Sequence, residues 1–315
     1  MNTVLLNQML QLFMIMGVGY VLFKLKYIDI PFSQKLTKLL LDITLPFMIL
    51  SSVMSGSADK DFSKIGIVFV VSFSMYVVLT VLSIIVVKIF RFPLKEQGMY
   101  MFMHMFSNTA FMGFPVISAL FGNEAMIYTA ILNIFFNLFA FTVGIVMVNY
   151  DASEKKKGTS FSEMFDLKNL LTPGTTGSLA AVVIYFIPVE FPSVIRGVFS
   201  SVGGLTPTLA MILIGSTLAK MPVNIIFNDW RVYLFTALKQ VIIPVLVWPL
   251  MKLLIDDTLI RSVIFILFLM PVGNTAVLFA SRYQKNEELA AKTVFVTTLA
   301  SILTIPFCLN VLKVL

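Results

Sequence analysis

Two short stretches, "SNTAFMGFP" from Ser107 and "MPVGNTAVLFA" from Met270, place amide and hydroxyl side chains beside Gly and Pro within long apolar runs. These residue types weaken a helix, because Asn and Thr compete for backbone groups, Gly costs entropy and Pro lacks an N–H donor. Their side chains donate and accept hydrogen bonds. The chemistry they suggest is therefore binding at a broken helix.

A helix that breaks inside hydrocarbon must have its freed backbone groups contacted by protein or water. Half-helix N-termini offer N–H groups and partial positive charge, which suit an anion, whereas C-terminal carbonyls suit a cation. The predicted substrate-binding residues are the polar residues of both motifs and two asparagines spaced i, i+4 in the next apolar run: Ser107, Asn108, Thr109, Asn274, Thr275, Asn133 and Asn137. For the last two, hydrogen bonding between helices is the alternative. The predicted helix-breaking residues are Gly113, Pro115, Pro271 and Gly273.

The elements that must hold these motifs are membrane helices. Of the 315 residues, 58% are hydrophobic and only 12% are charged, and the mean hydropathy is +0.95. This composition predicts an all-α polytopic membrane protein in a lipid bilayer. Ten apolar segments are each long enough to cross ~30 Å of hydrocarbon: 3–23, 35–54, 65–88, 98–121, 124–148, 169–188, 194–218, 231–254, 260–281 and 288–312.

The basic residues indicate the orientation of these ten spans. On one side of the membrane lie Lys24, Lys26, Lys35, Lys38, Lys88, Arg91, Lys95, Lys155, Lys156, Lys157, Lys168, Lys220, Arg231, Lys239, Arg282, Lys285 and Lys292. The other side has only Lys60, Lys64, Arg196, Lys252, Arg261 and Lys313. The excess marks the first side as cytoplasmic and puts both termini outside the cell membrane. Membrane orientation thus accounts for the net charge of +7, and no nucleic-acid partner is expected.

The two halves of the chain look like copies of each other. "GNEAMIYTA" from Gly122 parallels "KNEELAAKT" from Lys285, and "TLPFMILSS" from Thr44 parallels "TPTLAMILIGS" from Thr206, in the same order as the two broken motifs. Five spans per half is an odd number, so the second copy is inverted in the membrane. We expect a first repeat over 1–150, a cytoplasmic loop over 151–168 and a second repeat over 169–315.

The extended motifs "SNTAFMGFPVISALFG" and "MPVGNTAVLFASRYQKNEELAAKTVFVTTLASILTIP" resemble the signatures of the auxin efflux carrier family. That family includes plant PIN proteins and bacterial carriers for malonate and related organic acids. The resemblance implies the fold of bile acid/sodium symporters, in which broken helices four and nine cross between a scaffold or panel domain and a transport domain. By this resemblance, Asn108 corresponds to the asparagine at the family's helix crossover, and Asn274 corresponds to the matching residue of the second repeat. The resemblance also implies a homodimer. The family commonly has a second Pro at the break in helix nine, whereas this sequence has Gly273 there.

Ionisable residues within the predicted spans are candidates for proton coupling. Asp42 is the first candidate, because a carboxylate on a short side chain inside the membrane must form an ion pair, take up a proton or contact water. His104, one turn before the first break, titrates near neutrality and is the second, with simple packing as its alternative. For Lys239 we expect the long stem to carry the ammonium to the cytoplasmic interface.

Other function classes find little support in the sequence. One Cys and one His exclude a thiolate metal cluster and the usual zinc or haem sites, so no metal or cofactor is expected beyond a coupling H⁺ or Na⁺. No phosphate-binding "GxxxxGK[ST]" motif occurs, and Asp256 and Asp257 are expected to be solvated. The sequence predicts no enzyme but a secondary transporter of a small organic anion, working by an elevator or rocking movement. The alternatives are a sodium-coupled symporter and a membrane receptor or scaffold that does not translocate its ligand.

Overall fold

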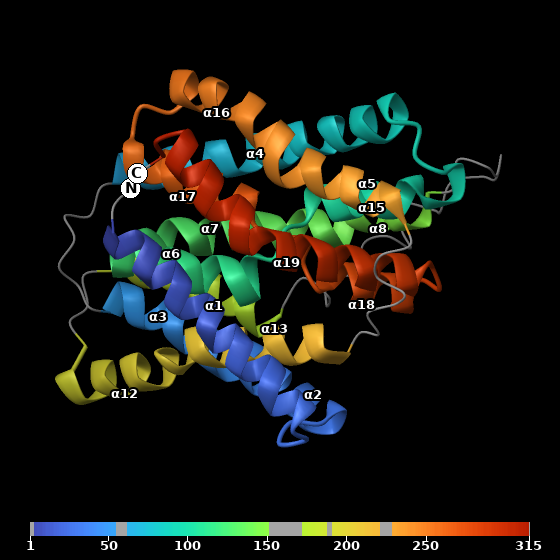
Figure 1. The fold of residues 1–315 in the computed structure, drawn as a ribbon. Coiled ribbons are helices and arrows are strands. Elements are labelled where there is room, and N and C mark those ends of the chain that lie inside the picture. The colour runs from blue at the N-terminus through green and yellow to red at the C-terminus, as the bar shows by residue number, and fades with distance from the viewer. Residues whose placement is uncertain (1–2, 55–61, 151–171, 188–190, 221–228, 315) are drawn as a thin grey trace.

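The computed structural model describes residues 3–54, 62–150, 172–187, 191–220 and 229–314, which fold into helices joined by short connections (Figure 1). Within these ranges, six helical stretches are long and apolar enough to cross a membrane: Ile30–Met54, Ser63–Ile89, Thr109–Asn149, Ser193–Lys220, Trp230–Leu254 and Glu287–Val311. Shorter apolar helices cover Leu10–Lys24, Pro173–Phe186 and Thr258–Leu269. The chain is thus an all-helical polytopic protein. The loop predicted over 151–168 lies outside the described residues.

The helices of the first half are often joined end to end through π-helical or 3₁₀ turns. In order they are α1 (Thr3–Lys24), α2 (Ile30–Leu39), η1 (Leu40–Thr44), α3 (Leu45–Met54), α4 (Phe62–Ile89), η2 (Leu94–Glu96), α5 (Gln97–Met105), η3 (Thr109–Gly113), α6 (Phe114–Phe121), η4 (Gly122–Ala125), α7 (Met126–Phe139), η5 (Ala140–Gly144) and α8 (Ile145–Asn149). The turns η1, η3 and η5 are π-helical, a geometry that is frequent at functional sites.

The second half has the same character. Its helices are α11 (Pro173–Phe186), α12 (Ser193–Gly203), α13 (Leu205–Lys220), α15 (Trp230–Ala237), η6 (Leu238–Ile242), α16 (Ile243–Leu254), α17 (Thr258–Leu269), α18 (Thr275–Arg282) and α19 (Glu287–Val311). α11 is shorter than the predicted segment 169–188. It starts where Thr172 caps the N-terminus and Pro173 occupies the first turn, and it ends because Ile187, which precedes Pro188, is extended.

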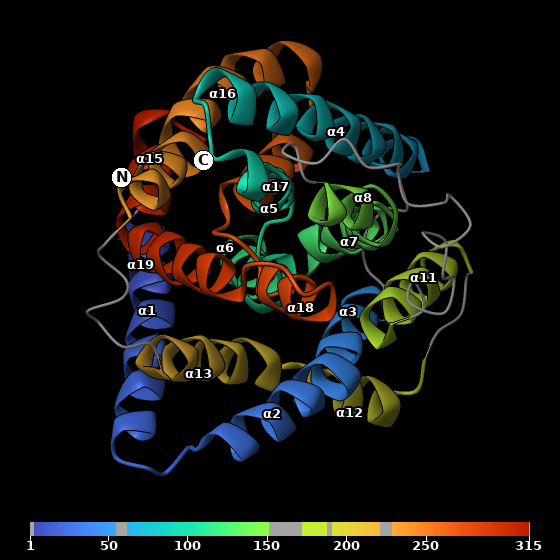
Figure 2. The same ribbon diagram turned by 90° about the vertical axis from the view of Figure 1, so that its right-hand side faces the viewer.

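The helices fall into two groups by their packing. α1 packs along α13, and α3 packs against α11 and α12. The first group therefore consists of α1 to α3 and α11 to α13. α4 packs against α5 and α7, and α19 packs against α15 and α18. These helices belong to the second group, which consists of α4 to α8 and α15 to α19. Figure 2 shows the first group as an outer layer below and beside the second. Contacts of α7 with α11 and of α1 with α6 join the two groups.

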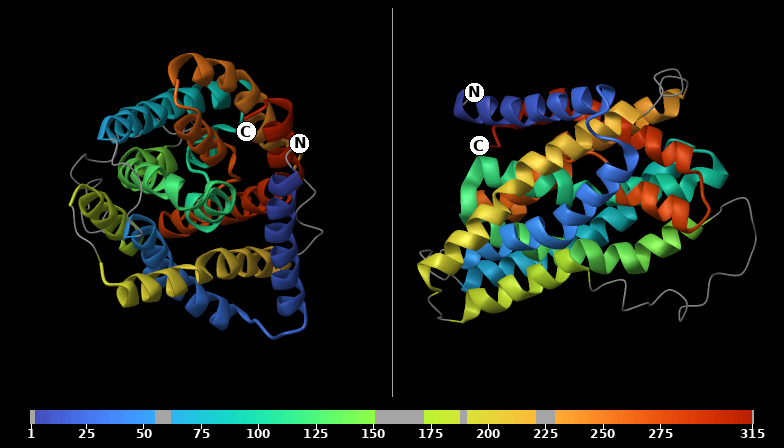
Figure 3. Two further views of the ribbon diagram at one scale, coloured as in Figure 1. Left: turned by 90° about the vertical axis from the view of Figure 1, so that its left-hand side faces the viewer. Right: turned by 90° about the horizontal axis from the view of Figure 1, so that it is seen from below.

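The outer surface of the molecule is apolar, as a lipid-facing surface must be. Leu246 on α16 is 70% exposed, Leu303 on α19 is 75% exposed and Val70 on α4 is 67% exposed. The start of α1 and the end of α19 lie at the same end of the molecule (Figure 3). Both observations agree with a chain that crosses a membrane several times.

Glycine allows the close crossing of α1 and α13. A Cβ added at Gly19 would overlap the backbone of Ile212, and a Cβ added at Gly215 would overlap the carbonyl oxygen of Met16. Small residues at such a contact bring two helix backbones together, which is how membrane helices gain packing energy. The two helices therefore hold each other through main chain as well as side chains.

We predict that Gly215→Ala lowers the thermal unfolding midpoint of the purified protein in detergent. The new methyl group forces the backbones of α1 and α13 apart, at a cost of about 1–3 kcal/mol. Gly17→Ala is the matched control, because a Cβ at Gly17 meets nothing within 4 Å. Equal midpoints for the two variants would contradict the close crossing.

Candidate functional site

Both polar motifs interrupt their helices, and the two interruptions meet. α5 ends at Met105 and η3 begins at Thr109, while α17 ends at Leu269 and α18 begins at Thr275. In the gaps, Ser107 and Val272 form an isolated antiparallel β-bridge. The Asn108 N–H donates to the Pro271 carbonyl over 2.7 Å, and the Gly273 N–H donates to the Phe106 carbonyl over 3.1 Å. We call this paired segment, residues 106–108 and 270–274, the crossover.

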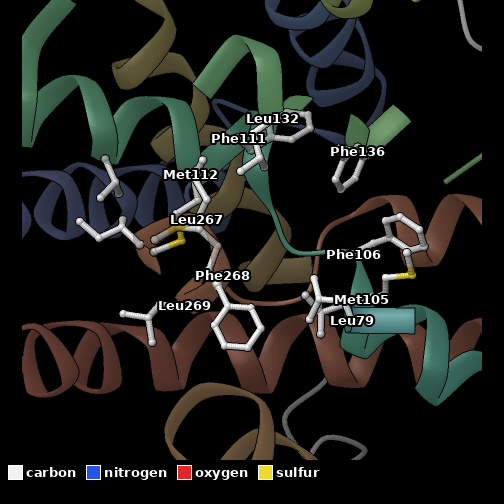
Figure 4. Close-up of a cluster of buried hydrophobic side chains, with 14 of the residues drawn as sticks. Leu79, Met105, Phe106, Phe111, Met112, Leu132, Phe136, Leu267, Phe268 and Leu269 are labelled. Carbon is white, nitrogen blue, oxygen red and sulfur yellow. The ribbon is translucent and has the colours of Figure 1, made fainter. Parts of the chain in front are cut away.

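The predicted helix breakers lie in and beside the crossover. Gly273 is within it, and a Cβ there would lie 3.1 Å from the Ser107 carbonyl oxygen. Gly113 faces Leu267, since a Cβ at that position would lie 2.6 Å from Leu267 Cδ2. Pro115 occupies the first turn of α6, where its missing N–H is tolerated. Figure 4 shows buried apolar side chains from α4, α5, η3, α7 and α17 around the extended segment that follows Phe106.

Thr297 of α19 holds the 270–274 segment of the crossover by a hydrogen bond. Its hydroxyl accepts a hydrogen bond from the Val272 N–H over 3.1 Å and donates to the Thr293 carbonyl over 2.7 Å. The side-chain amide of Gln240 donates to the Thr297 carbonyl over 2.8 Å. The Val272 N–H, which no helix satisfies, thus has a buried partner.

We predict that Thr297→Val destabilises the protein, because the Val272 N–H loses its acceptor in a buried site, at a cost of about 1–3 kcal/mol. The measurement is the thermal unfolding midpoint in detergent. Thr304→Val on the same helix is the control, since the Thr304 hydroxyl has no hydrogen-bond partner among the described residues. A Thr297→Val midpoint no lower than that of the control would show that this bond contributes nothing.

A cavity of about 270 Å³ lies against the crossover. Its walls include all seven predicted binding residues, Ser107, Asn108, Thr109, Asn133, Asn137, Asn274 and Thr275, and also Asp42. The first helix group contributes Leu41, Asp42, Leu45, Thr172, Pro173 and Gly174, while the remaining lining residues come from the second group. Both helix groups therefore contribute to the wall of the cavity.

The polar groups of the cavity divide into bonded and unbonded ones. Asn108 Oδ1 caps its own half-helix by accepting from the Phe111 N–H over 3.2 Å. The buried hydroxyls of Thr109 and Thr275 have no partner among the described residues. Thr109 and Thr275 begin the half-helices on the two sides of the crossover. The two hydroxyls are thus unpaired beside the cavity, whereas N–H groups of both half-helix starts, such as those of Thr109 and Ala276, are bonded within the chain.

Asn133 and Asn137 both line the cavity and both make hydrogen bonds within the protein. Asn133 Nδ2 donates to Ser178 Oγ of α11 over 3.2 Å, which connects the two helix groups. Asn137 Nδ2 donates to the Asn133 carbonyl over 2.8 Å. The alternative of hydrogen bonding between helices therefore applies to Asn133, whose side chain also reaches the cavity wall.

Lys239 is where the sequence-based expectation is wrong. Its side chain does not extend to the interface but is only 2% exposed. Its ammonium donates to the His104 carbonyl over 2.9 Å and to Ser107 Oγ over 3.0 Å. The π-helical turn η6 carries Lys239 on a helix packed against the crossover region, and depth along the helix alone could not reveal the direction of the side chain.

Asp42 and His104 occupy different surroundings. Asp42 lies in the π-helical turn η1, is half-buried and lines the cavity. His104 is buried, does not line the cavity, and packs its ring edge-on to Phe235 with 6.4 Å between centroids. Both of its ring nitrogens lack a partner among the described residues. A role of either residue in proton coupling stays a prediction.

The hydroxyls of Thr293, Thr297 and Ser301 each donate to a carbonyl of their own helix, α19. One smaller expectation needs correction. Asp257 is not simply solvated, because it caps α17 and forms a 2.9 Å ion pair with Lys64. Burial would raise the pKa of Asp257, but the Ile260 N–H and Lys64 outweigh it and hold that pKa below its usual range.

Comparison with known proteins agrees with this architecture. Residues 4–309 match the family described as "Membrane transport protein". The chain belongs to this family. The match bears out the resemblance to auxin efflux carriers read from the two broken motifs. The chain is also similar to an uncharacterized transporter of Methanocaldococcus jannaschii, with 23% identity over 279 residues and 87% of each chain covered. The protein is thus a multi-pass membrane protein of a membrane transporter family.

Proposed function

We propose that the protein is a secondary active carrier of a small organic anion, a carboxylate, which binds in the cavity at the crossover. The observation that carries the proposal is the meeting of two broken helices by main-chain hydrogen bonds beside a cavity whose largely apolar wall contains several polar side chains. The half-helix N-termini supply partial positive charge for an anion, and the unpaired threonine hydroxyls supply hydrogen-bond donors. Alternating access comes from an elevator or rocking movement of one helix group against the other.

The proposed topology has ten spans in two inverted repeats, 1–150 and 169–315. The meeting of one broken motif from each half of the chain at the crossover supports it. α1–α3 with α11–α13 correspond to the scaffold domain, and the remaining helices correspond to the transport domain. Both termini are extracellular in a protein of the plasma membrane, and a homodimer follows from the family resemblance.

The cavity belongs to the cytoplasmic half of the membrane in this topology. It is lined by Asp42 and by Thr172, which follow predicted cytoplasmic segments closely in the chain. Its walls come from both helix groups, so movement between the groups would open or close it. The described conformation thus corresponds to the inward-facing half of the cycle.

We predict that a thermal-shift screen over mono- and dicarboxylates finds ligands that stabilise the purified protein. Asn108→Ala should weaken their binding about tenfold, the equivalent of one hydrogen bond. Asn123→Ala is the control, because Asn123 is exposed outside the cavity. Equal ligand affinities for the two variants would show that the ligand does not bind at the crossover.

A ligand that stabilises the protein must also be moved if the protein is a carrier. We predict counterflow of the radiolabelled carboxylate in liposomes containing the purified protein. A membrane receptor would bind the same compound in the thermal-shift assay and show no counterflow. That result would overturn the carrier proposal and favour the receptor.

Asp42 is the proposed proton-coupling group, because it is the ionisable side chain that lines the cavity among the described residues. We predict uptake that ignores a sodium gradient and stops when protons equilibrate. Asp42→Asn should abolish proton-driven uptake and preserve counterflow. Uptake that follows the sodium gradient would instead support the sodium-coupled symporter.

A further inference from the structure

The buried ammonium of Lys239 lacks a counter-charge. Its hydrogen bonds go to the His104 carbonyl and Ser107 Oγ, and among the described residues the structure records no carboxylate in ion-pair distance. A charge taken out of water carries a large cost unless an opposite charge or several hydrogen bonds offset it. The carbonyl end of α5 offsets only part of a unit charge. An anion bound nearby would therefore stabilise this ammonium.

Ser107 connects this charge to the cavity. An ammonium only donates hydrogen bonds, so Ser107 Oγ must accept from Lys239. The hydroxyl hydrogen of Ser107 is then left to donate elsewhere, and the described residues provide no recorded acceptor for it. Ser107 lines the cavity, whereas Lys239 lies behind it. The Ser107 hydroxyl hydrogen is thus without a recorded acceptor in a residue that borders the cavity.

We propose that Lys239 is the specificity-determining residue of the crossover site and acts through Ser107. Its ammonium orients and polarises the Ser107 hydroxyl, which donates to a carboxylate in the cavity, and the carboxylate supplies the missing negative charge. The inference rests on the proposed function and adds to it the group that selects charge. One ammonium behind one hydroxyl matches a single carboxylate head.

The half-helix N-termini alone do not explain such selectivity. Their partial charges and N–H groups also attract neutral carbonyl compounds, which accept the same hydrogen bonds. A full unit charge separates a carboxylate from its amide, because only the carboxylate gains from it in a site with little water. Preference for an anion over a neutral compound of equal shape is thus the property that depends on Lys239.

The test compares malonate with malonamide, its neutral diamide, as probes of the purified protein by isothermal titration calorimetry. The wild type should bind malonate at least about tenfold more tightly than malonamide. Lys239→Met should remove this preference while malonamide affinity changes less than about twofold. Lys252→Met is the matched control, since it removes an exposed lysine from α16 of the same helical stretch and should keep the preference.

Ser107→Ala is the second variant, and it keeps the proposal testable if Lys239→Met does not fold. It should lower the preference for malonate as Lys239→Met does, and the double variant should lose no more than either single one. A preference unchanged in Lys239→Met or Ser107→Ala overturns this inference and leaves the carrier proposal standing. A wild type that binds neither malonate nor any carboxylate of the screen overturns both.

Discussion

Backbone groups that leave a helix inside hydrocarbon need partners, and water is not there to provide them. At the crossover each broken helix supplies what the other lacks, since Asn108 N–H pairs with the Pro271 carbonyl and Gly273 N–H with the Phe106 carbonyl. Thr297 then satisfies Val272 N–H. This mutual need joins segments far apart in the chain and points their half-helix ends at one cavity.

The same shortage of water gives Lys239 its importance. In an aqueous site a lysine beside a serine would exchange its partners freely, but here the ammonium is buried and its contacts are few. The carbonyl end of α5 accepts one of its hydrogen bonds and the cavity-lining Ser107 accepts another. Positive charge thus reaches the cavity without an exposed basic side chain on its wall.

The crossover and part of the cavity wall belong to different helix groups. The crossover and its supports, α15 to α19 with α4 to α8, belong to one group, while Asp42 and the start of α11 belong to the other. Asn133 bonds across the boundary to Ser178. The boundary is held by such isolated polar contacts and by apolar packing, whereas α1 and α13 within one group interlock at Gly19 and Gly215.

The sequence by itself determined the membrane class, the positions of both breaks and the polar residues that now share one cavity. Those features follow from local causes, because hydropathy, Pro, Gly and Asn act on the helix that contains them. Only the tertiary structure decided where long or rotatable side chains point. Lys239 turns inward to His104 and Ser107, and the hydroxyls of α19 bond to their own helix, because neighbouring helices offer or deny them partners. The close approach of α1 to α13 was likewise a matter of which glycines face each other, which depends on the rotation of two helices distant in the chain.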